Sequence, residues 1–270
     1  MASRKEQKEQ ARARRLAEEQ AAVAHAARRR RMQMLGGVVL AAVVVIAVAI
    51  AISSGGSSGS SGPVTGAKAT ATEKLVDNEL AGIPQSGTTL GNPKAPITMV
   101  YFGDLECPVC AAFTTGADDG GLPQLIDNQV KQGKVKVEYR SFCTATCNDE
   151  SQSVFNTQQV AAYAAGLQDR FWNYAELFYH EQGAEGSGYV TPTFLDNLAS
   201  QVPGLSISKW QTDRQDPDLL SQVESDEATA VKDGLTGTPT VIAEGPKGSD
   251  PAQEGIPPYS ELVSMINTVQ

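Results

Sequence analysis

The hydrophobic pattern divides the chain into parts that predict different kinds of structure. Residues 1–34 are polar and rich in Ala, Glu, Gln and Arg, which favour a helix without a core. Residues 35–52 form an uninterrupted apolar run, and residues 53–90 are Gly/Ser-rich and then mixed and polar. From residue 91 onward, short apolar runs alternate with amphipathic stretches, as expected for a folded α/β region.

The apolar run 35–52 contains no charge and no proline. At about 1.5 Å per residue it would span roughly 27 Å, near the lower limit for a transmembrane helix. Ten Lys and Arg precede it and none occurs in residues 53–67, so we expect a cytoplasmic N-terminus and an extracytoplasmic remainder. The long charged segment favours an uncleaved anchor over a signal peptide, although cleavage near Ser53 stays open. Residues 53–90 are expected to be a flexible linker.

The outer part begins with a parallel crossover pattern. Residues 97–102 (ITMVYF) predict a strand, followed by a turn at 103–106 and then by Cys107-Pro108-Val109-Cys110. Residues 122–132 have helical spacing, and residues 135–142 alternate like a second strand. This order is β–α–β.

The rest of this part is expected to be mostly helical before it returns to strand. Residues 150–233 show helical patterns, and a strand (238–243) and a C-terminal helix (258–268) follow. Within the helical stretch, individual helices are expected at Val154–Leu167, at Arg170–His180 and from Thr191-Pro192 onward.

The formal net charge of −9 is an average over two unlike parts. Residues 1–34 carry a net charge of +6, whereas the remainder carries 12 basic and 27 acidic residues. An acidic outer part argues against nucleic acid as a partner, because phosphate binding needs clustered Lys and Arg. No phosphate loop, dinucleotide fingerprint or EF-hand pattern is present, and no cofactor is expected.

The CxxC pair follows a strand directly, which suggests redox chemistry. If Cys107 begins a helix, the free amide groups and the helix dipole favour its thiolate. Pro108 suits the first helical turn, and Cys110 lies one turn further on, within reach of a disulfide. Metal binding and simple structural bridging are the alternatives for such a pair.

A second motif lies far away in the sequence. Thr238-Pro239-Thr240 precedes an apolar strand, and a cis proline there would place open backbone groups beside the reactive sulfur. Thr191-Pro192 has the same first two residues but precedes a predicted helix, so it is not expected to serve this purpose.

With these residues in place, the chain resembles the DsbA-like branch of the thioredoxin superfamily. The similar segments are FGDLECPVC (102–110), AAYAAGLQDRFWNYAELFYHEQ (161–182) and GLTGTPTVI (234–242). The resemblance implies an α/β thioredoxin fold whose core (91–149 and 234–270) is interrupted by a helical insertion (150–233). Here that fold would follow one transmembrane helix.

The same resemblance implies roles for individual residues. Cys107 would be the attacking cysteine, Cys110 the resolving cysteine and Pro239 the cis proline. The residues expected to contact the substrate are Pro108, Val109 and Thr238.

Two departures from the family pattern bear on the chemistry. Many relatives carry a buried acid six residues before the first cysteine, where this chain has Tyr101. Asp104 and Glu106 are then the nearest candidates for a proton relay to Cys110, with solvated turn carboxylates as the alternative. The Pro-Val between the cysteines also lacks a histidine that could stabilise the Cys107 thiolate, which bears on how strongly oxidising the disulfide is.

The other two cysteines, Cys143 and Cys147, are expected to form a structural disulfide, since residues i and i+4 of a helical turn lie within bonding range. A second redox pair, or a four-cysteine zinc site with CPVC, stays open, although no metal is expected. His180 ends an aromatic-rich helix, for which core packing is favoured over a peptide-binding face.

The sequence therefore predicts a membrane-anchored, extracytoplasmic thiol–disulfide oxidoreductase, most simply a dithiol oxidase acting on exported proteins with free thiols. The resemblance implies reoxidation by a quinone-linked membrane partner of the DsbB or vitamin K epoxide reductase type. One alternative is a reductase or isomerase of the same fold. Another is a non-catalytic binding module whose cysteines hold inert bridges or zinc.

Overall fold

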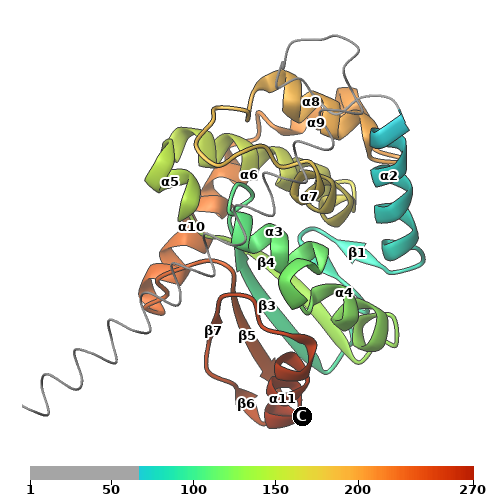
Figure 1. Ribbon diagram of the computed structural model, residues 1–270, viewed down its shortest axis with the longest axis vertical. Helices are drawn as coiled ribbons and strands as arrows, with labels where there is room; N and C mark the ends of the chain where they lie inside the picture. Colours follow the sequence, from blue (N-terminus) through green and yellow to red (C-terminus); the bar gives the residue numbers. More distant parts are fainter. Residues whose placement is uncertain (1–66) are drawn as a thin grey trace, which may run out of the picture. The chain divides into compact units, whose positions relative to one another are not determined.

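The computed structural model describes residues 67–270 (Figure 1). The predicted basic tail (1–34), the predicted membrane span (35–52) and the first part of the predicted linker lie outside the described residues. Within residues 67–270, no helix is long and apolar enough to cross a membrane.

Three strands form the centre of a mixed sheet. β3 (Ile97–Gly103) pairs in parallel with β4 (Val135–Ser141) along its whole length, from Ile97 opposite Val135 to Gly103 opposite Ser141. β5 (Thr240–Gly245) pairs antiparallel with β3 on its other side. The short strands β1 (Gln85–Ser86), β2 (Thr89–Leu90), β6 (Gly248–Ser249) and β7 (Gln253–Glu254) extend the sheet at its edges.

Alternate residues of β3 supply two separate apolar layers, as the period of a strand requires. Met99 and Tyr101 join the main core, whereas Val100 and Phe102 join a smaller cluster that includes Ala230. Ala230 belongs to α10 (Pro217–Lys232), which packs against β4. The sheet is therefore covered on both faces, and its central strand β3 is a nearly continuous hydrophobic run, whereas β4 alternates.

The predicted crossover is present between β3 and β4. It contains α3 (Pro108–Thr115), the short turn η1 (Ala117–Asp119), α4 (Leu122–Leu125) and the π-helical turn η2 (Ile126–Val130). The last two together occupy the helix expected over 122–132. The C-terminal helix α11 (Tyr259–Val269) packs against β5 and α4, close to its expected bounds.

The helical stretch between β4 and β5 contains the expected helices. The three expected helices are α6 (Gln152–Gly166), α7 (Phe171–His180) and α8 (Pro192–Gln201), and the structure adds α5 (Ala145–Asp149), α9 (Ile207–Asp213) and α10. Thr191 caps α8 through its side chain, in agreement with the Thr-Pro helix start. α10 contacts both α6 and β4, so this last helix covers the sheet as well as the insertion.

The predicted flexible linker 53–90 differs from the structure in its described part. Residues Ala67–Leu80 form the helix α2, which packs against α7 and α8, and β1 and β2 form a hairpin that joins β4. Val76 and Leu80 are buried in the main core. The sequence hides this because only a few apolar residues on a polar helix make the contact, and the turn glycines resemble linker residues.

Candidate active site

Cys107 lies at the junction of β3 and α3, where it is the N-cap residue of the helix. Pro108 occupies the first helical turn, so its missing N–H leaves no helical hydrogen bond unmade. Cys107 and Cys110 are both buried and carry free thiols, whereas Pro108 and Val109 are exposed, Val109 to 38%. The two predicted substrate-contact residues between the cysteines are thus open to a partner.

The loop before β5 reaches the same sulfur from the other side. The Thr238–Pro239 peptide bond is cis, as the sequence analysis expected. The Cys107 thiol donates to the Thr238 carbonyl oxygen at 3.4 Å, and the Thr238 side chain acts to lower the pKa of both cysteines. The structure therefore brings together both cysteines and the Thr238–Pro239 pair, although Cys107 and Thr238 are 131 residues apart in the sequence.

This environment gives the two thiols different pKa values. The pKa of Cys107 is lowered from 9.0 to about 7, first by the hydrogen bond from Cys110. Thr238 and the backbone N–H groups of Cys110 and Val109 lower this pKa further, whereas burial raises it. Burial raises the pKa of Cys110 well above its usual value. The lower pKa favours Cys107 over Cys110 as the thiolate, while the roles of attacking and resolving cysteine implied by the family resemblance stay predictions.

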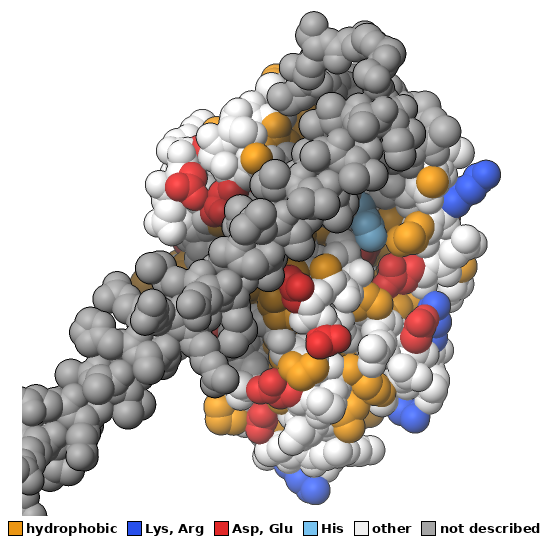
Figure 2. Space-filling view, viewed as in Figure 1, with side chains coloured by type: hydrophobic (Ala, Val, Ile, Leu, Met, Phe, Trp, Pro, Cys, Tyr) orange, Lys and Arg blue, Asp and Glu red, His pale blue; other side chains and the backbone are white. Residues whose placement is uncertain are grey.

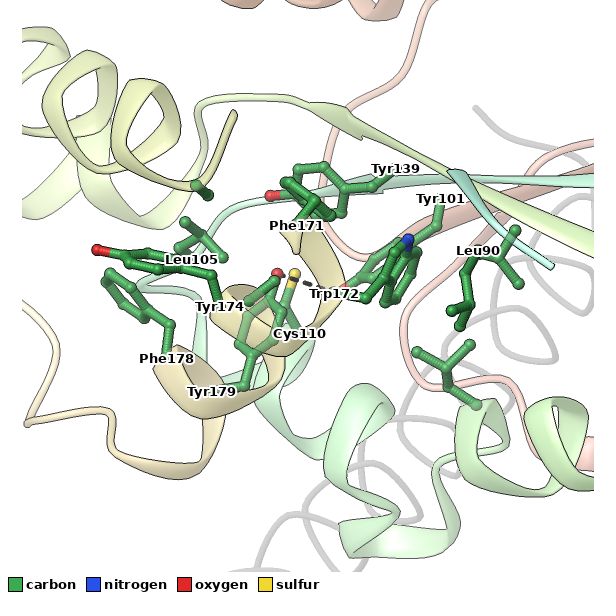
Figure 3. Packing of buried hydrophobic residues seen from close by; sticks show 14 of the residues in the cluster. Leu90, Tyr101, Leu105, Cys110, Tyr139, Phe171, Trp172, Tyr174, Phe178 and Tyr179 are labelled. Atoms are coloured by element: carbon green, nitrogen blue, oxygen red, sulfur yellow. Dashed lines mark hydrogen bonds between the residues drawn. The ribbon is translucent and has the colours of Figure 1, made fainter. Parts of the chain in front are cut away.

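Tyrosines occupy the space where many relatives carry a buried acid. The Tyr101 hydroxyl lies 3.2 Å from both the Thr114 and the Tyr179 hydroxyls. The Tyr179 side chain lies beside Cys110 in the core (Figure 3). Burial, and then the charge that Cys110 can carry, raise the pKa of Tyr101 well above its usual value. These phenols stay protonated. They can therefore donate a hydrogen bond, but they cannot accept a proton as the carboxylate of a buried acid would.

Gly103 lets the tyrosines approach one another. A Cβ atom there would lie 2.6 Å from Tyr139 Cε2 and 3.0 Å from the Tyr179 hydroxyl. Any larger residue would push these rings away from the core beside Cys110. Sequence analysis missed Tyr139 and Tyr179, because they come from β4 and α7 and resemble ordinary core aromatics.

Asp104 is fully buried, so the expected alternative of a solvated turn carboxylate is wrong for this residue. Its Oδ2 accepts from the backbone N–H groups of Thr144 and Thr146, both at 3.0 Å. Its Oδ1 accepts from the Thr146 hydroxyl at 2.6 Å. Burial nevertheless raises the pKa of Asp104. These bonds direct the carboxylate toward the loop after β4, while its proposed relay to Cys110 stays a prediction.

Glu106 is also buried, with 2% of its surface exposed, so the solvated alternative is wrong here too. Neither carboxylate oxygen has a hydrogen-bond partner among the described residues, since the Thr146 hydroxyl proton is given to Asp104. Burial first, and then the charges of Glu150 and Asp104, raise the pKa of Glu106 to about 7. The residue before the reactive cysteine is thus an unsatisfied acid, and its relay role also stays a prediction.

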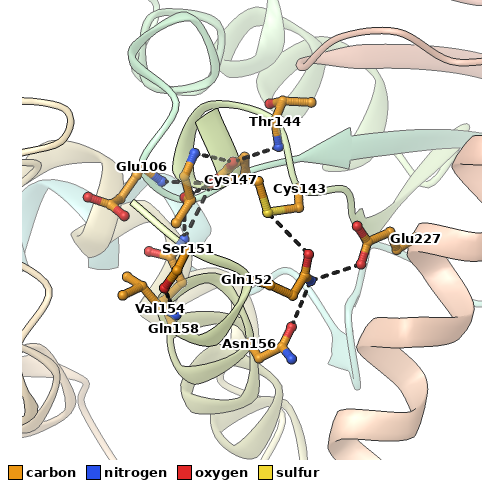
Figure 4. Close-up of a disulfide and its surroundings, with 12 residues drawn as sticks. Glu106, Cys143, Thr144, Cys147, Ser151, Gln152, Val154, Asn156, Gln158 and Glu227 are labelled. Atoms are coloured by element: carbon orange, nitrogen blue, oxygen red, sulfur yellow. Dashed lines mark hydrogen bonds between the residues drawn. A yellow bond between two sulfur atoms is a disulfide. The ribbon is translucent and has the colours of Figure 1, made fainter. Parts of the chain in front are cut away.

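Cys143 and Cys147 are joined by a disulfide at the start of α5, with their Cα atoms 5.7 Å apart (Figure 4). The predicted bond is therefore present, while its structural or redox role stays a prediction. Because both sulfurs are in that bond, they are not thiolates that could join Cys107 and Cys110 as zinc ligands. Within residues 67–270, no cluster of His, Cys, Asp and Glu is arranged to hold a metal ion.

The aromatic helix α7 packs into the core. Its five aromatic residues are all buried: Phe171, Trp172, Tyr174, Phe178 and Tyr179. His180 follows them, and its Nε2 has no hydrogen-bond partner in the described part of the chain. Burial lowers the pKa of His180, so this residue is neutral near pH 7.

Two further contacts hold the active-site segment, and no motif in the sequence indicated them. Gln182, just after α7, donates to the carbonyl oxygens of Leu105 and Cys107 at 2.6 and 3.1 Å. The Thr144 hydroxyl lies 2.5 Å from that of Thr238. Gln182 belongs to the helical insertion and Thr144 to the loop after β4, so segments outside the CxxC helix help to fix the position of Cys107.

The geometry defines a thioredoxin-fold site with two buried cysteines of unlike pKa beside a cis proline. A thioredoxin family model matches residues 85–258. The chain therefore belongs to the thioredoxin family, and it is a DsbA-like thiol–disulfide oxidoreductase.

Named relatives are consistent with this class. The probable disulfide bond formation protein D of Bacillus anthracis is 25% identical over 158 residues, which cover 58% of this chain and 69% of the relative. Disulfide bond formation protein D of Bacillus subtilis is 24% identical over 177 residues, covering 66% and 74%.

Solved structures show the same fold. Oxidised BdbD from Bacillus subtilis has a TM-score of 0.56 at 23% identity, and the match covers 68% of this chain and 94% of that chain. The α-DsbA1 protein from Wolbachia pipientis has a TM-score of 0.55 at 17% identity, covering 70% and 91%.

Proposed function

We propose that this protein is an extracytoplasmic dithiol oxidase that forms disulfides in exported proteins. The observation that carries the proposal is the environment of Cys107, whose sulfur lies at the N-terminus of α3 beside the Thr238–Pro239 loop and whose pKa is lowered, first by Cys110 and then by Thr238. Stabilising the Cys107 thiolate stabilises the reduced pair, and a pair whose reduced form is stabilised is a better oxidant. The names of the Bacillus relatives point to the same direction of reaction.

The reaction starts from the Cys107–Cys110 disulfide. A substrate thiolate attacks the Cys107 sulfur, so a substrate–Cys107 disulfide forms and Cys110 leaves as a thiolate. Because burial raises the pKa of Cys110, this thiolate takes up a proton. A second substrate thiolate then attacks the substrate sulfur of the mixed disulfide, and Cys107 leaves. The substrate loses two electrons and the cysteine pair gains them.

The exposed Pro108 and Val109 and the loop at Thr238 and Pro239 surround the sulfur that is attacked. An extended substrate segment beside the cis proline would pair with backbone groups there, and its side chains would lie over Val109. The reduced pair is reoxidised by a quinone-linked membrane protein of the DsbB or vitamin K epoxide reductase type. The predicted anchor 35–52 would keep the domain near such a partner.

The cellular placement is part of the proposal. It is supported by the apolar run 35–52 and by the excess of basic residues before it. Acidic side chains are spread over the visible face of the molecule and Lys and Arg are few, which does not suit a nucleic-acid surface (Figure 2). Alkaline phosphatase fused after Gln270 should be active in cells, and the same enzyme fused after Met34 should be inactive. The reverse pattern would overturn the orientation.

The redox potential of the Cys107–Cys110 pair tests the direction of the reaction. We expect a value between about −200 and −120 mV against glutathione, because the Bacillus relatives are named for disulfide bond formation; the pKa of Cys107, about 7, is similar to that of thioredoxin and does not by itself set the direction. A potential near −270 mV, about that of thioredoxin, would favour the reductase. A second assay separates the oxidase from an isomerase. The oxidase should oxidise a reduced substrate protein but should not repair a substrate with scrambled disulfides.

A further inference from the structure

The loop that carries the second disulfide touches the active site at Thr144. This residue lies between Cys143 and Cys147 and immediately before α5. Its hydroxyl is 2.5 Å from the Thr238 hydroxyl, and its N–H donates to Asp104 Oδ2 at 3.0 Å. A link therefore runs from the second disulfide to the residue that precedes the cis proline.

The Thr144 hydroxyl does not make the helix-capping bond that a threonine at this position usually makes. Thr144 is the N-cap residue of α5, a position at which Thr normally accepts a bond from the helix backbone. Here its side chain makes no capping bond, and its hydroxyl meets Thr238 instead. The contact thus replaces a local interaction that would stabilise the helix.

The direction of the bond follows from the number of protons. A hydroxyl carries one proton, so Thr238 can donate to a sulfur only if it accepts from Thr144. In the arrangement we infer, Thr144 donates to Thr238, so that the Thr238 proton can turn toward the Cys107 thiolate, whose pKa the Thr238 side chain lowers. Hydrogen bonds in such a chain strengthen one another in a buried site.

The disulfide and Asp104 hold Thr144 in place for this bond. Cys143 and Cys147 close a tight loop around it, and the Asp104 carboxylate binds the N–H groups of Thr144 and Thr146. Asp104 also accepts the N–H of Cys107 at its carbonyl oxygen, at 3.1 Å. The loop is therefore fixed relative to the reactive cysteine from two sides.

We propose that Thr144, held by the Cys143–Cys147 disulfide, is a positioning residue that directs the Thr238 hydroxyl toward the active-site sulfurs. The second disulfide then affects the first cysteine pair by holding Thr144 in position, and it exchanges no electrons itself. This inference rests on the proposed thiol–disulfide function, although it does not depend on the direction of that reaction.

The test uses full-length Cys110→Ala protein, in which Cys107 is the one free thiol while Cys143–Cys147 stays oxidised without reductant. The rate at which iodoacetamide alkylates Cys107 is followed against pH. Changing Thr144→Val in this background should raise the pKa of Cys107 by about 0.5 unit, since one indirect hydrogen bond is lost. Thr144→Ser should restore the original pKa, because only the hydroxyl is needed.

The matched control is Thr212→Val on α9, an exposed threonine whose hydroxyl bonds to the Ser208 carbonyl oxygen. It should leave the pKa unchanged. An unchanged pKa in Thr144→Val, with a native circular dichroism spectrum, would overturn the proposal. So would a shift that Thr144→Ser fails to restore. If Cys107 reacts no faster than an ordinary thiol in reduced protein that keeps Cys110, the proposed function fails instead.

The role of the disulfide is tested in the same background with Cys143→Ala and Cys147→Ala together. The pKa of Cys107 should rise by about the same 0.5 unit or less, because the loop then moves more freely. If the double variant keeps the original pKa, Asp104 alone holds Thr144 and the part assigned to the disulfide is wrong.

Discussion

The two cysteine pairs of this protein occupy equivalent places and have different chemistry. Cys107 and Cys110 follow β3, and Cys143 and Cys147 follow β4. Because β3 and β4 are parallel and end in register at Gly103 and Ser141, both pairs lie at the same edge of the sheet. Each pair also lies at the start of a helix.

The difference between the pairs comes from what surrounds each sulfur. Cys107 has the N-terminus of an eight-residue helix on one side and the loop of Thr238 and Pro239 on the other. The second pair is closed as a disulfide across the short helix α5 and is half-buried. Reactivity therefore depends on a neighbouring segment far away in sequence, and not on the presence of two nearby cysteines.

The largest expected difference is in catalysis. Cys107→Ala should reduce the oxidation of a reduced substrate protein by at least about 1,000-fold, because the attacked sulfur is gone. The matched variant with both Cys143→Ala and Cys147→Ala should retain activity within about threefold, which allows for the small change in the pKa of Cys107. Turnover with a fluorescent dithiol peptide measures both. Equal losses in the two variants would show that the second pair relays electrons.

The two thiols of the first pair should also differ strongly in reactivity. At pH 7 about half of Cys107 is thiolate, whereas burial keeps Cys110 protonated. Alkylation of reduced protein should therefore modify Cys107 at least about 100-fold faster than Cys110. Its rate should rise about tenfold per pH unit below pH 7 and level off above it. Peptide mass mapping after short exposures gives both rates, and equal labelling would refute the assignment of Cys107 as nucleophile.

Replacing each of the two acids beside the first cysteine pair should change the stability of the protein in opposite directions. Asp104→Asn should destabilise the protein by about 3 kcal/mol, since the Thr144 and Thr146 N–H groups lose a carboxylate acceptor. Glu106→Gln should stabilise it above pH 7 by about 1 kcal/mol, a figure reduced for partial solvent screening.

The sign for Glu106 follows from its raised pKa. An acid whose pKa rises from 4.5 to about 7 on folding favours the folded state when protonated, so its contribution is lost as the pH rises through that range. Glu106→Gln should therefore differ from the original protein at pH 8 and match it near pH 4.5. Thermal unfolding at both pH values measures this, and a gain at pH 4.5 that vanishes at pH 8 would contradict it.

A further expected effect concerns the stability given by the second disulfide. Its cysteines are four residues apart, so loss of the bridge should lower the free energy of unfolding by about 2 kcal/mol in the chain-entropy account. Urea unfolding of the Cys143→Ala, Cys147→Ala double variant measures it. No loss of stability would leave positioning of Thr144 as the remaining purpose of the bond.

The sequence predicted much of the fold because its signals are local. The β3 run, the CxxC after it and the Thr-Pro before β5 each show in a few consecutive residues. The insertion helices show through their apolar spacing. The helix α2 did not show, because its stability comes from contacts with α7 and α8 and not from its own pattern.

By itself, the sequence determined the reactive pair, the cis-proline segment and the order of the elements, since motifs and hydrophobic periods are read along the chain. Only the tertiary structure decided how the site is surrounded. It buried Asp104 and Glu106, placed tyrosines behind Cys110 and set Thr144 against Thr238. The physical reason is that burial and hydrogen-bond partners depend on segments that meet only after folding.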